Sequence, residues 1–132
     1  MPRHPLDKAE YAIKPRDIVL IWTGAGAYNN EDRYHTDHAG MSADATLWLI
    51  EKGVKVMGCD APTFDPPVWA MFEKKKFWEA HHVMLSHEYY HIENMQNFES
   101  IPCAHGFKLA VFPIKWKGAT GAAVRAAAII ED

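Results

Sequence analysis

Two residues whose types suit metal chemistry, His81 and Glu93, lie on either side of an expected turn between a helix and a strand. Imidazole nitrogens and carboxylate oxygens are common ligands of zinc-like divalent ions, which usually take about four to six donor atoms. The pair therefore predicts a metal site if further ligands converge on it. The alternative is a partly exposed helix histidine and a strand glutamate that is hydrogen-bonded to its neighbours.

The elements that must position this pair are a helix over about residues 78–87 and a strand over 89–95. Successive helix side chains lie about 100° apart, so at most one of His81 and His82 points into the same pocket as Glu93. Side chains of a strand alternate between its two faces. One face of this strand is predicted to carry Tyr89, His91 and Glu93.

The remaining pattern predicts an α/β fold, with a mixed β-sheet and helices packed against it. Ser42 is a suitable N-cap for a helix that Gly53 ends, and helical sequence resumes near Val68. Residues 1–15 are predicted to be a lead-in arm, and residues 16–132 a single domain. Further strands are predicted over residues 17–23, 54–59, 107–114 and 123–130.

Composition narrows the possible functions. The chain has 132 residues, 48% of them hydrophobic, and a formal net charge of -3, so no basic footprint for nucleic acid is present. Its apolar runs are far shorter than the roughly 20 residues that span a bilayer. Cys59 and Cys103 lack the spacing of a disulfide framework or a zinc knuckle. We expect a soluble, cytoplasmic protein with two buried free thiols and no nucleic-acid or membrane partner.

A second histidine cluster lies in the loop that precedes the helix beginning near Ser42. His35, Asp37 and His38 fall within four residues of a segment rich in Gly, Asn and Asp. Such a loop can bind a metal, but it more often caps the following helix or lies in solvent. Both interpretations stay open on the sequence alone.

Three other charged residues have alternative roles. Asp60 and Asp65 flank Pro62 and could be paired carboxylates, although an Asp at the end of a strand commonly accepts hydrogen bonds from loop amides, and this structural role is favoured. Arg125 lies among alanines and is either an internal clamp or an edge residue. Because neither a Gly-x-Ser-x-Gly motif nor an activated cysteine is evident, metal-assisted chemistry remains.

Four blocks in order carry a more specific signal than any single motif: IKPRDIVLIWTG, HAGMSADATLWLIEKGVKVMGCDAPTFDPP, HHVMLSHEYYHIENMQNFESIP and FKLAVFPIKWKGATGAAVRAAAII. From Lys14 onwards the chain resembles the C-terminal part of the cyclase-like metal-dependent hydrolases, of the kynurenine formamidase and isatin hydrolase type. The resemblance implies a swivelling β/β/α-like fold. It also implies hydrolysis of an amide, lactam or related cyclic carbonyl substrate, a small molecule.

The resemblance assigns ligands as well. His81 and Glu93 match the family's two late metal ligands, and the implied cofactor is one or two divalent ions, often zinc or manganese. Three nearby histidines match no ligand of the family: His82, His87 and His91. No catalytic residue is assigned.

The chain also departs from the family's pattern. Ala39 and Ala123 replace prolines, and the early His-x-Gly-Thr-His-x-Asp motif has no counterpart in the sequence. We therefore expect a portion truncated at its N-terminus, with half a metal site, weak metal binding and little turnover. The alternatives are a non-catalytic assembly or binding protein, completed by self-association as a homo-oligomer or by a partner chain, and a degenerate gene fragment.

Overall fold

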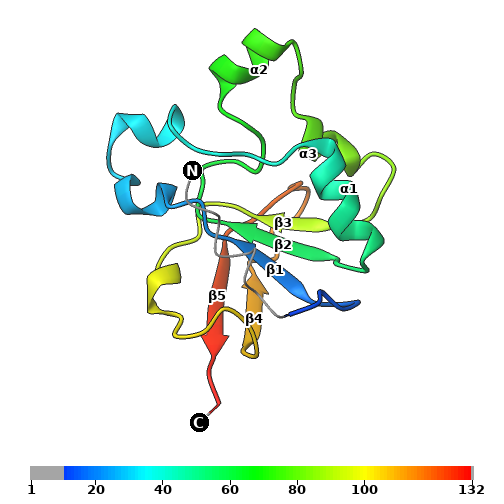
Figure 1. The fold of residues 1–132 in the computed structure, drawn as a ribbon, viewed down its shortest axis with the longest axis vertical. Helices are drawn as coiled ribbons and strands as arrows, with labels where there is room; N and C mark the ends of the chain where they lie inside the picture. The colour runs from blue at the N-terminus through cyan, green and yellow to red at the C-terminus, as the bar shows by residue number, and fades with distance from the viewer. Residues whose placement is uncertain (1–10, 132) are drawn as a thin grey trace. The chain divides into compact units, whose positions relative to one another are not determined.

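A three-stranded parallel sheet forms the framework of residues 12–98 in the computed structural model, which describes residues 11–131. Its strands lie in the order β1 (Ile18–Ile21), β2 (Val56–Cys59) and β3 (Tyr90–Ile92) (Figure 1). β2 is central and pairs with both neighbours in parallel register. Because the carboxyl ends of parallel strands share one edge, residues that follow β2 and β3 come together there.

Helix α1 (Ala43–Glu51) connects β1 to β2 and begins as the sequence predicts. The Ser42 hydroxyl oxygen accepts a 3.2 Å hydrogen bond from the Ala45 amide, which satisfies one amide of the first turn. The helix ends at Glu51 with Lys52 as its C-cap, and Gly53 follows with φ 88°, a conformation that glycine adopts at little cost. Both predicted ends of this helix are confirmed.

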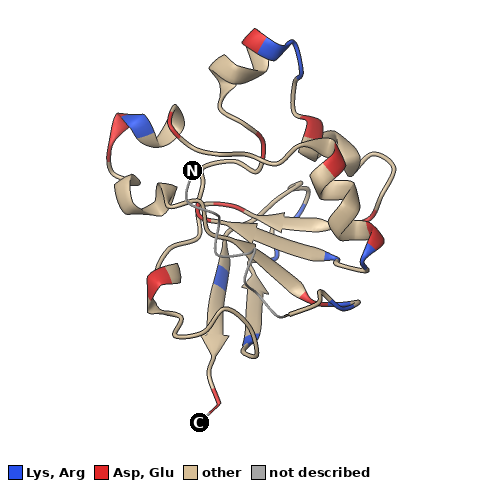
Figure 2. Ribbon diagram, in the orientation of Figure 1, with Lys and Arg blue, Asp and Glu red and all other residues tan. Residues whose placement is uncertain are grey.

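Two short helices, α2 (Val68–Lys74) and α3 (Glu79–Val83), lie between β2 and β3. Lys75 and Trp78 adopt left-handed backbone conformations, so the chain turns sharply between the helices. The helix predicted over residues 78–87 is therefore shorter than expected and continues only as turns after Val83. Acidic and basic residues are interspersed along the chain, and a basic stretch closes α2 (Figure 2).

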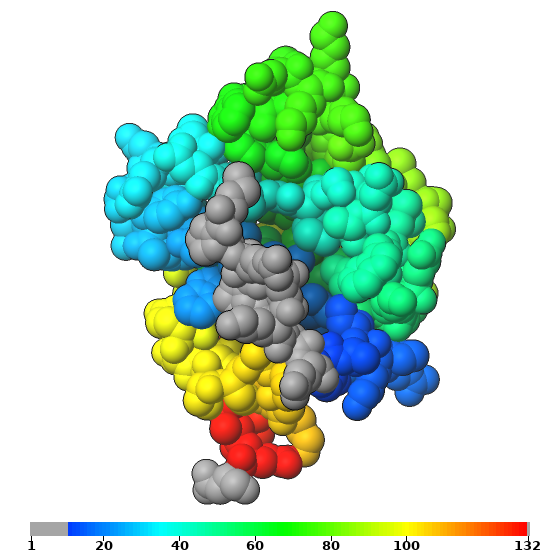
Figure 3. All heavy atoms as spheres, viewed as in Figure 1, coloured from blue at the N-terminus to red at the C-terminus, as the bar shows by residue number. Residues whose placement is uncertain are grey.

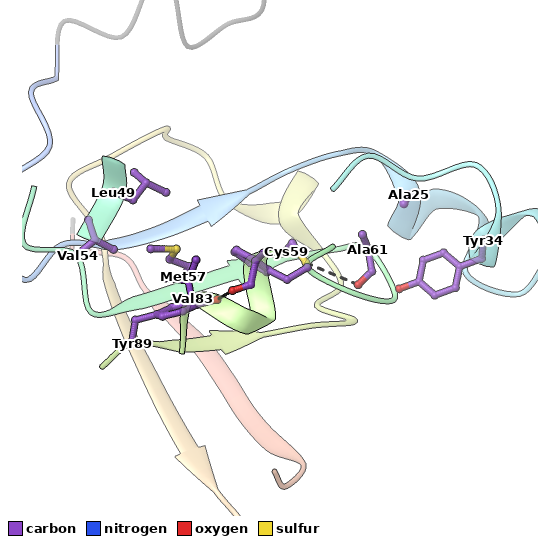
Figure 4. Close-up of a cluster of buried hydrophobic side chains, with 11 residues drawn as sticks. Ala25, Tyr34, Leu49, Val54, Met57, Cys59, Ala61, Val83 and Tyr89 are labelled. Carbon is purple, nitrogen blue, oxygen red and sulfur yellow. Dashed lines mark hydrogen bonds between the residues drawn. The ribbon is translucent and has the colours of Figure 1, made fainter. Parts of the chain in front are cut away.

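The core of this unit is a cluster of buried side chains between the sheet and the helices α1 and α3 (Figure 4). Val54 and Met57 are fully buried, and Val83 brings α3 onto the sheet. The buried Tyr89 hydroxyl donates a 2.6 Å hydrogen bond to the Ala80 carbonyl. This bond fixes α3 against the start of β3, and these are the two elements that carry the predicted ligands.

The second compact unit comprises residues 99–131 together with Tyr11. It contains an antiparallel pair, β4 (Lys108–Pro113) and β5 (Val124–Ile129), in which Lys108 lies opposite Ile129. Arg125 lies opposite Phe112 and is exposed, so it is not an internal clamp. Within the described residues, the unit has these two strands.

The predicted α/β class is confirmed, although the parallel and antiparallel pairs lie in two sheets and not in one mixed sheet. Each predicted strand is present and is shorter by two to four residues, and the predicted end of β2 at Cys59 is confirmed. The lead-in arm predicted over residues 1–15 falls mostly outside the described residues, and the single domain over 16–132 stays a prediction. Among the described helices, none is both long enough and apolar enough to cross a membrane.

Candidate metal centre

Three potential ligand atoms converge at the carboxyl edge of the parallel sheet. His81 lies on α3, His91 on β3, and Glu93 one residue beyond the end of β3. The Glu93 Oε1 atom lies 3.7 Å from His81 Nε2 and 3.5 Å from His91 Nε2. The three residues each offer a ligand atom, and these atoms all lie within 4.8 Å of one another. Within residues 11–131 this is the one such group of three or more.

These separations suit a divalent ion. Metal–ligand bonds of 2.0–2.2 Å in a tetrahedral site place neighbouring ligand atoms about 3.4 Å apart. The observed 3.5 and 3.7 Å are close to that value and exceed the usual length of a direct hydrogen bond, about 2.9 Å. Two imidazoles and a carboxylate form a ligand set found at zinc and non-haem iron sites. The residues therefore fit the ion that the family implies.

Asp65 orients His81. Its buried carboxylate contacts the His81 Nδ1 atom and accepts hydrogen bonds from the amides of Ala80 at 2.7 Å and His81 at 3.2 Å. Trp78, the residue before α3, has no side-chain cap of its own, so this distant carboxylate satisfies two amides of the first turn. A proton held on Nδ1 leaves the Nε2 lone pair directed toward Glu93.

His91 is held by two aromatic neighbours. Its ring stacks on Phe64, with centroids 5.0 Å apart and planes 7° from parallel, and its side chain is 9% exposed. Its Nδ1 atom lies 3.4 Å from the Tyr89 hydroxyl. Burial lowers the pKa of His91, an effect increased by nearby His81 and opposed by the Glu93 carboxylate. The net shift favours the neutral imidazole, which is the form that binds metals.

Glu93 is held at its other side by the backbone. Its Oε1 atom accepts a 2.8 Å hydrogen bond from the Phe64 amide. The side chain is 26% exposed, and that of His81 is 36% exposed, so the group is reachable from solvent. The site thus combines fixed ligands with an open side, as catalytic metal sites do.

Of the two other predicted carboxylates, Asp60 lies outside this group and Asp65 lies next to it. Asp60 accepts hydrogen bonds from the Thr23 amide and hydroxyl, both at 2.7 Å, and from the Gly24 and Gly26 amides. Its favoured structural role is confirmed, because it closes the loop that follows β1. Asp65 likewise accepts amide hydrogen bonds, but it also touches a predicted ligand.

The loop cluster does not form a metal-binding group with the other described residues. His38 is buried with its Nδ1 atom 3.1 Å from the Ala39 carbonyl oxygen, and Asp37 accepts a hydrogen bond from the Thr36 hydroxyl. His35 and His82 are exposed. Cys59 and Cys103 are both free thiols, but only Cys59 is buried, so the expectation that both thiols are buried is wrong for Cys103.

His91 is the residue that sequence reasoning did not assign. The family resemblance assigns no ligand to His91, nor to the exposed His82 and His87 near it in the sequence. The signal was nevertheless present, since the alternation of β3 places His91 and Glu93 on the same face. The structure brings His81 and Glu93 near each other, and His91 lies beside them.

Comparisons with known proteins find similarity to one family. Residues 3–66 match the family model described as "Putative cyclase". The chain is 30% identical over 122 residues to a kynurenine formamidase of Maricaulis maris (strain MCS10), a match that covers 92% of the chain and 54% of that protein. It is 29% identical over 84 residues to a kynurenine formamidase of Erythrobacter litoralis (strain HTCC2594), covering 64% of the chain and 35% of that protein.

The chain thus spans about half the length of the Maricaulis maris protein and about a third of the Erythrobacter litoralis protein. The similarity runs through both the β1–β2 half, which the family match covers, and the segment that carries the candidate ligands. The resemblance predicted from the four sequence blocks is confirmed, since the chain is similar to the cyclase family model and to the two kynurenine formamidases.

Proposed function

We propose that the chain provides a metal centre for hydrolysis of an amide, lactam or related cyclic carbonyl in a small molecule. The observation that carries the proposal is the convergence of His81 and Glu93 at the edge of the sheet, with an open side to solvent. The names of the relatives support a formamide as the substrate class to test first. Zinc and manganese are the proposed ions.

The roles of the chain's own residues follow from their contacts. His81 and Glu93 hold the ion, and Asp65 keeps His81 in the tautomer that exposes Nε2. The chemistry that a divalent ion would supply there is polarisation of a carbonyl oxygen and a lowering of the pKa of bound water to about 7. We expect little turnover from the chain alone, because the early His-x-Gly-Thr-His-x-Asp motif is absent from its sequence.

Metal analysis and an aryl formamide assay test this function together. The purified chain, freed of metal and reloaded with zinc or manganese, should bind one equivalent and release formate slowly from an N-formyl aniline. The metal affinity and the rate of formate release should both fall at least tenfold in His81→Ala and in Glu93→Gln, since each variant loses a ligand. His82→Ala, an exposed neighbour on the same helix, is the matched control. Tight binding of one equivalent that survives His81→Ala would contradict the proposal.

A second candidate function is assembly with another copy of the chain, without catalysis. The observation that favours it is a group of large apolar side chains on α2 and the segment after it, each more than 40% exposed: Val68, Trp69, Phe72, Phe77 and Trp78. In the space-filling view the segment of α2 projects from its surroundings (Figure 3). A surface of this kind usually associates.

Sedimentation velocity distinguishes this candidate. A homo-oligomer that dissociates in Trp69→Glu and Phe72→Glu but persists in Glu73→Gln, an exposed neighbour on the same helix, would support it. A monomer with a cooperative melt would argue against it.

A further inference from the structure

We infer that His91 is a third ligand of the proposed metal centre and that Tyr89 is the positioning residue that makes it one. The inference deepens the proposed function and rests on it for the presence of a metal. It changes the expected composition of the site from two ligands to three. Residues of α3 and β3 would then supply a complete set for a catalytic-type ion, with one position left open.

His91 and Glu93 are spaced as two ligands of one ion would be. His91 Nε2 lies 3.5 Å from Glu93 Oε1, nearer than His81 Nε2 at 3.7 Å. An ordinary hydrogen bond between these groups would be about 2.9 Å long, whereas two ligands of one ion lie about 3.4 Å apart. The pair is therefore spaced for a shared ion and not for a direct contact.

The contacts of His91 favour the tautomer whose Nε2 lone pair can bind a metal. A neutral imidazole carries one N–H, and a metal can bind only the other nitrogen. The Tyr89 hydroxyl donates its hydrogen to the Ala80 carbonyl oxygen at 2.6 Å, so its lone pairs face outward as acceptors. His91 Nδ1 lies 3.4 Å from the Tyr89 hydroxyl oxygen and is placed to donate its N–H to it. The lone pair of His91 Nε2 is then directed toward Glu93.

Phe64 holds both His91 and Glu93 in place. A histidine that only filled the core would be free to choose either ring orientation. The Phe64 ring stacks on His91 at 5.0 Å, and the amide of the same Phe64 holds Glu93 Oε1 at 2.8 Å. One residue therefore fixes both ligands on this side of the site. On the other side, Asp65 does the same for His81.

The site has the composition of a two-histidine, one-carboxylate centre. Its two imidazoles receive different support, a buried carboxylate behind His81 and a neutral hydroxyl behind His91. A hydrogen bond to the ring nitrogen that does not bind the metal typically contributes 10- to 100-fold to metal affinity. Loss of the Tyr89 hydroxyl should therefore weaken metal binding without removing a ligand.

The test uses the full chain, cobalt and zinc, and needs no substrate. Cobalt(II) titration followed by visible absorption, with zinc competition, gives the affinity and reports the number of ligands. We expect His91→Phe, which keeps a ring to stack on Phe64, and His91→Asn to lower the zinc affinity at least tenfold and to change the cobalt spectrum. Tyr89→Phe should lower the affinity about 10- to 100-fold with a spectrum of the wild-type form. The control is Tyr90→Phe, an exposed tyrosine on the same strand.

Nitrogen NMR of histidine-labelled chain provides the readout that a merely structural role would not change. In the metal-free chain His91 should be the Nδ1–H tautomer, its Nε2 resonance should shift on zinc addition, and Tyr89→Phe should mix the tautomers. Wild-type affinity in a folded His91→Phe chain, with binding lost in His81→Ala, would overturn the inference and leave the proposed centre standing. No zinc binding by the wild-type chain would overturn both. An unchanged tautomer and affinity in folded Tyr89→Phe would overturn the role of Tyr89.

Discussion

At the scale of single residues, Asp65 connects the helix to the site. It is fully buried and accepts from two amides of α3 as well as touching His81. Asp65→Asn retains the shape of the side chain but replaces one acceptor oxygen by a donor amide. We expect zinc affinity to fall about 10- to 100-fold and the chain to lose stability, because a buried amide then faces other donors.

Isothermal titration with zinc and urea unfolding measure the two effects of Asp65→Asn. The exposed Asp37→Asn should leave both unchanged and is the control for the loss of a charge. An unaltered zinc affinity in Asp65→Asn would show that the carboxylate supports the helix but not the ligand.

The two thiols should differ in reactivity. Cys59 is 3% exposed, and burial raises its pKa to about 12, whereas Cys103 is exposed. The thiolate is the reactive form, so one thiol should react rapidly with a disulfide reagent near pH 8 and the second only on unfolding. Cys103→Ser should abolish the rapid phase. Two rapid equivalents in the native chain would contradict the assignment.

At the scale of elements, the loop after β2 must pass very close to the segment before α1. A Cβ atom at Gly40 would overlap the backbone of Asp65 and Pro66, so only glycine fits there without displacing them. Gly40→Ala should therefore move Asp65 and weaken zinc binding, as well as lower the free energy of unfolding by roughly 1–3 kcal/mol. Gly121→Ala is the control, since a Cβ there meets nothing within 4 Å.

Titration of zinc into Gly40→Ala, with its unfolding curve measured in parallel, tests the consequence of this close approach. A stable variant with unchanged zinc affinity would mean that the loop can shift without moving the Asp65 carboxylate.

Local elements of the fold could be read from the sequence, but their pairing could not. The N-cap at Ser42, the Gly53 stop and the strands are encoded by neighbouring residues, and they were predicted. The division into two sheets depends on contacts between distant segments, which no local pattern reports. Strand alternation predicts His91 on the same face as Glu93, but its approach to His81 depends on the pairing of β3 with β2 and on the stacking of Phe64, which arise only in the folded chain.

At the scale of the whole molecule, three buried acids predict a loss of stability at high pH. Burial raises the pKa of Cys59, Tyr34 and Tyr89 to about 12, from unfolded values of 9.0 for the thiol and 10.0 for the phenols. Between each group's unfolded pKa and its folded pKa of about 12, the unfolded chain releases a proton that the folded chain retains. Stability should be complete below pH 9 and fall as the pH rises toward 12, by up to ~1.4 kcal/mol per pH unit for each group.

Urea unfolding between pH 8 and pH 11 measures this dependence. Cys59→Ala should flatten the decline just above pH 9, where the thiol titrates before the phenols, even though it lowers stability at neutral pH. Cys103→Ala should leave the profile unchanged. A profile that is equally steep in Cys59→Ala would assign the decline to other groups.

The arrangement of α3 and β3 also bears on the order of folding. All four groups of the candidate centre, from Asp65 to Glu93, lie on one short stretch of chain, and β2 and β3 pair through it. The crossover from β1 to β2 through α1 is of similar length, since Ile18 pairs with Val56 and Val56 pairs with Tyr90, so loop closure does not favour either pairing. The candidate ligands would therefore gather at the step in which β3 pairs with β2, and an ion present during folding would encounter them at that step.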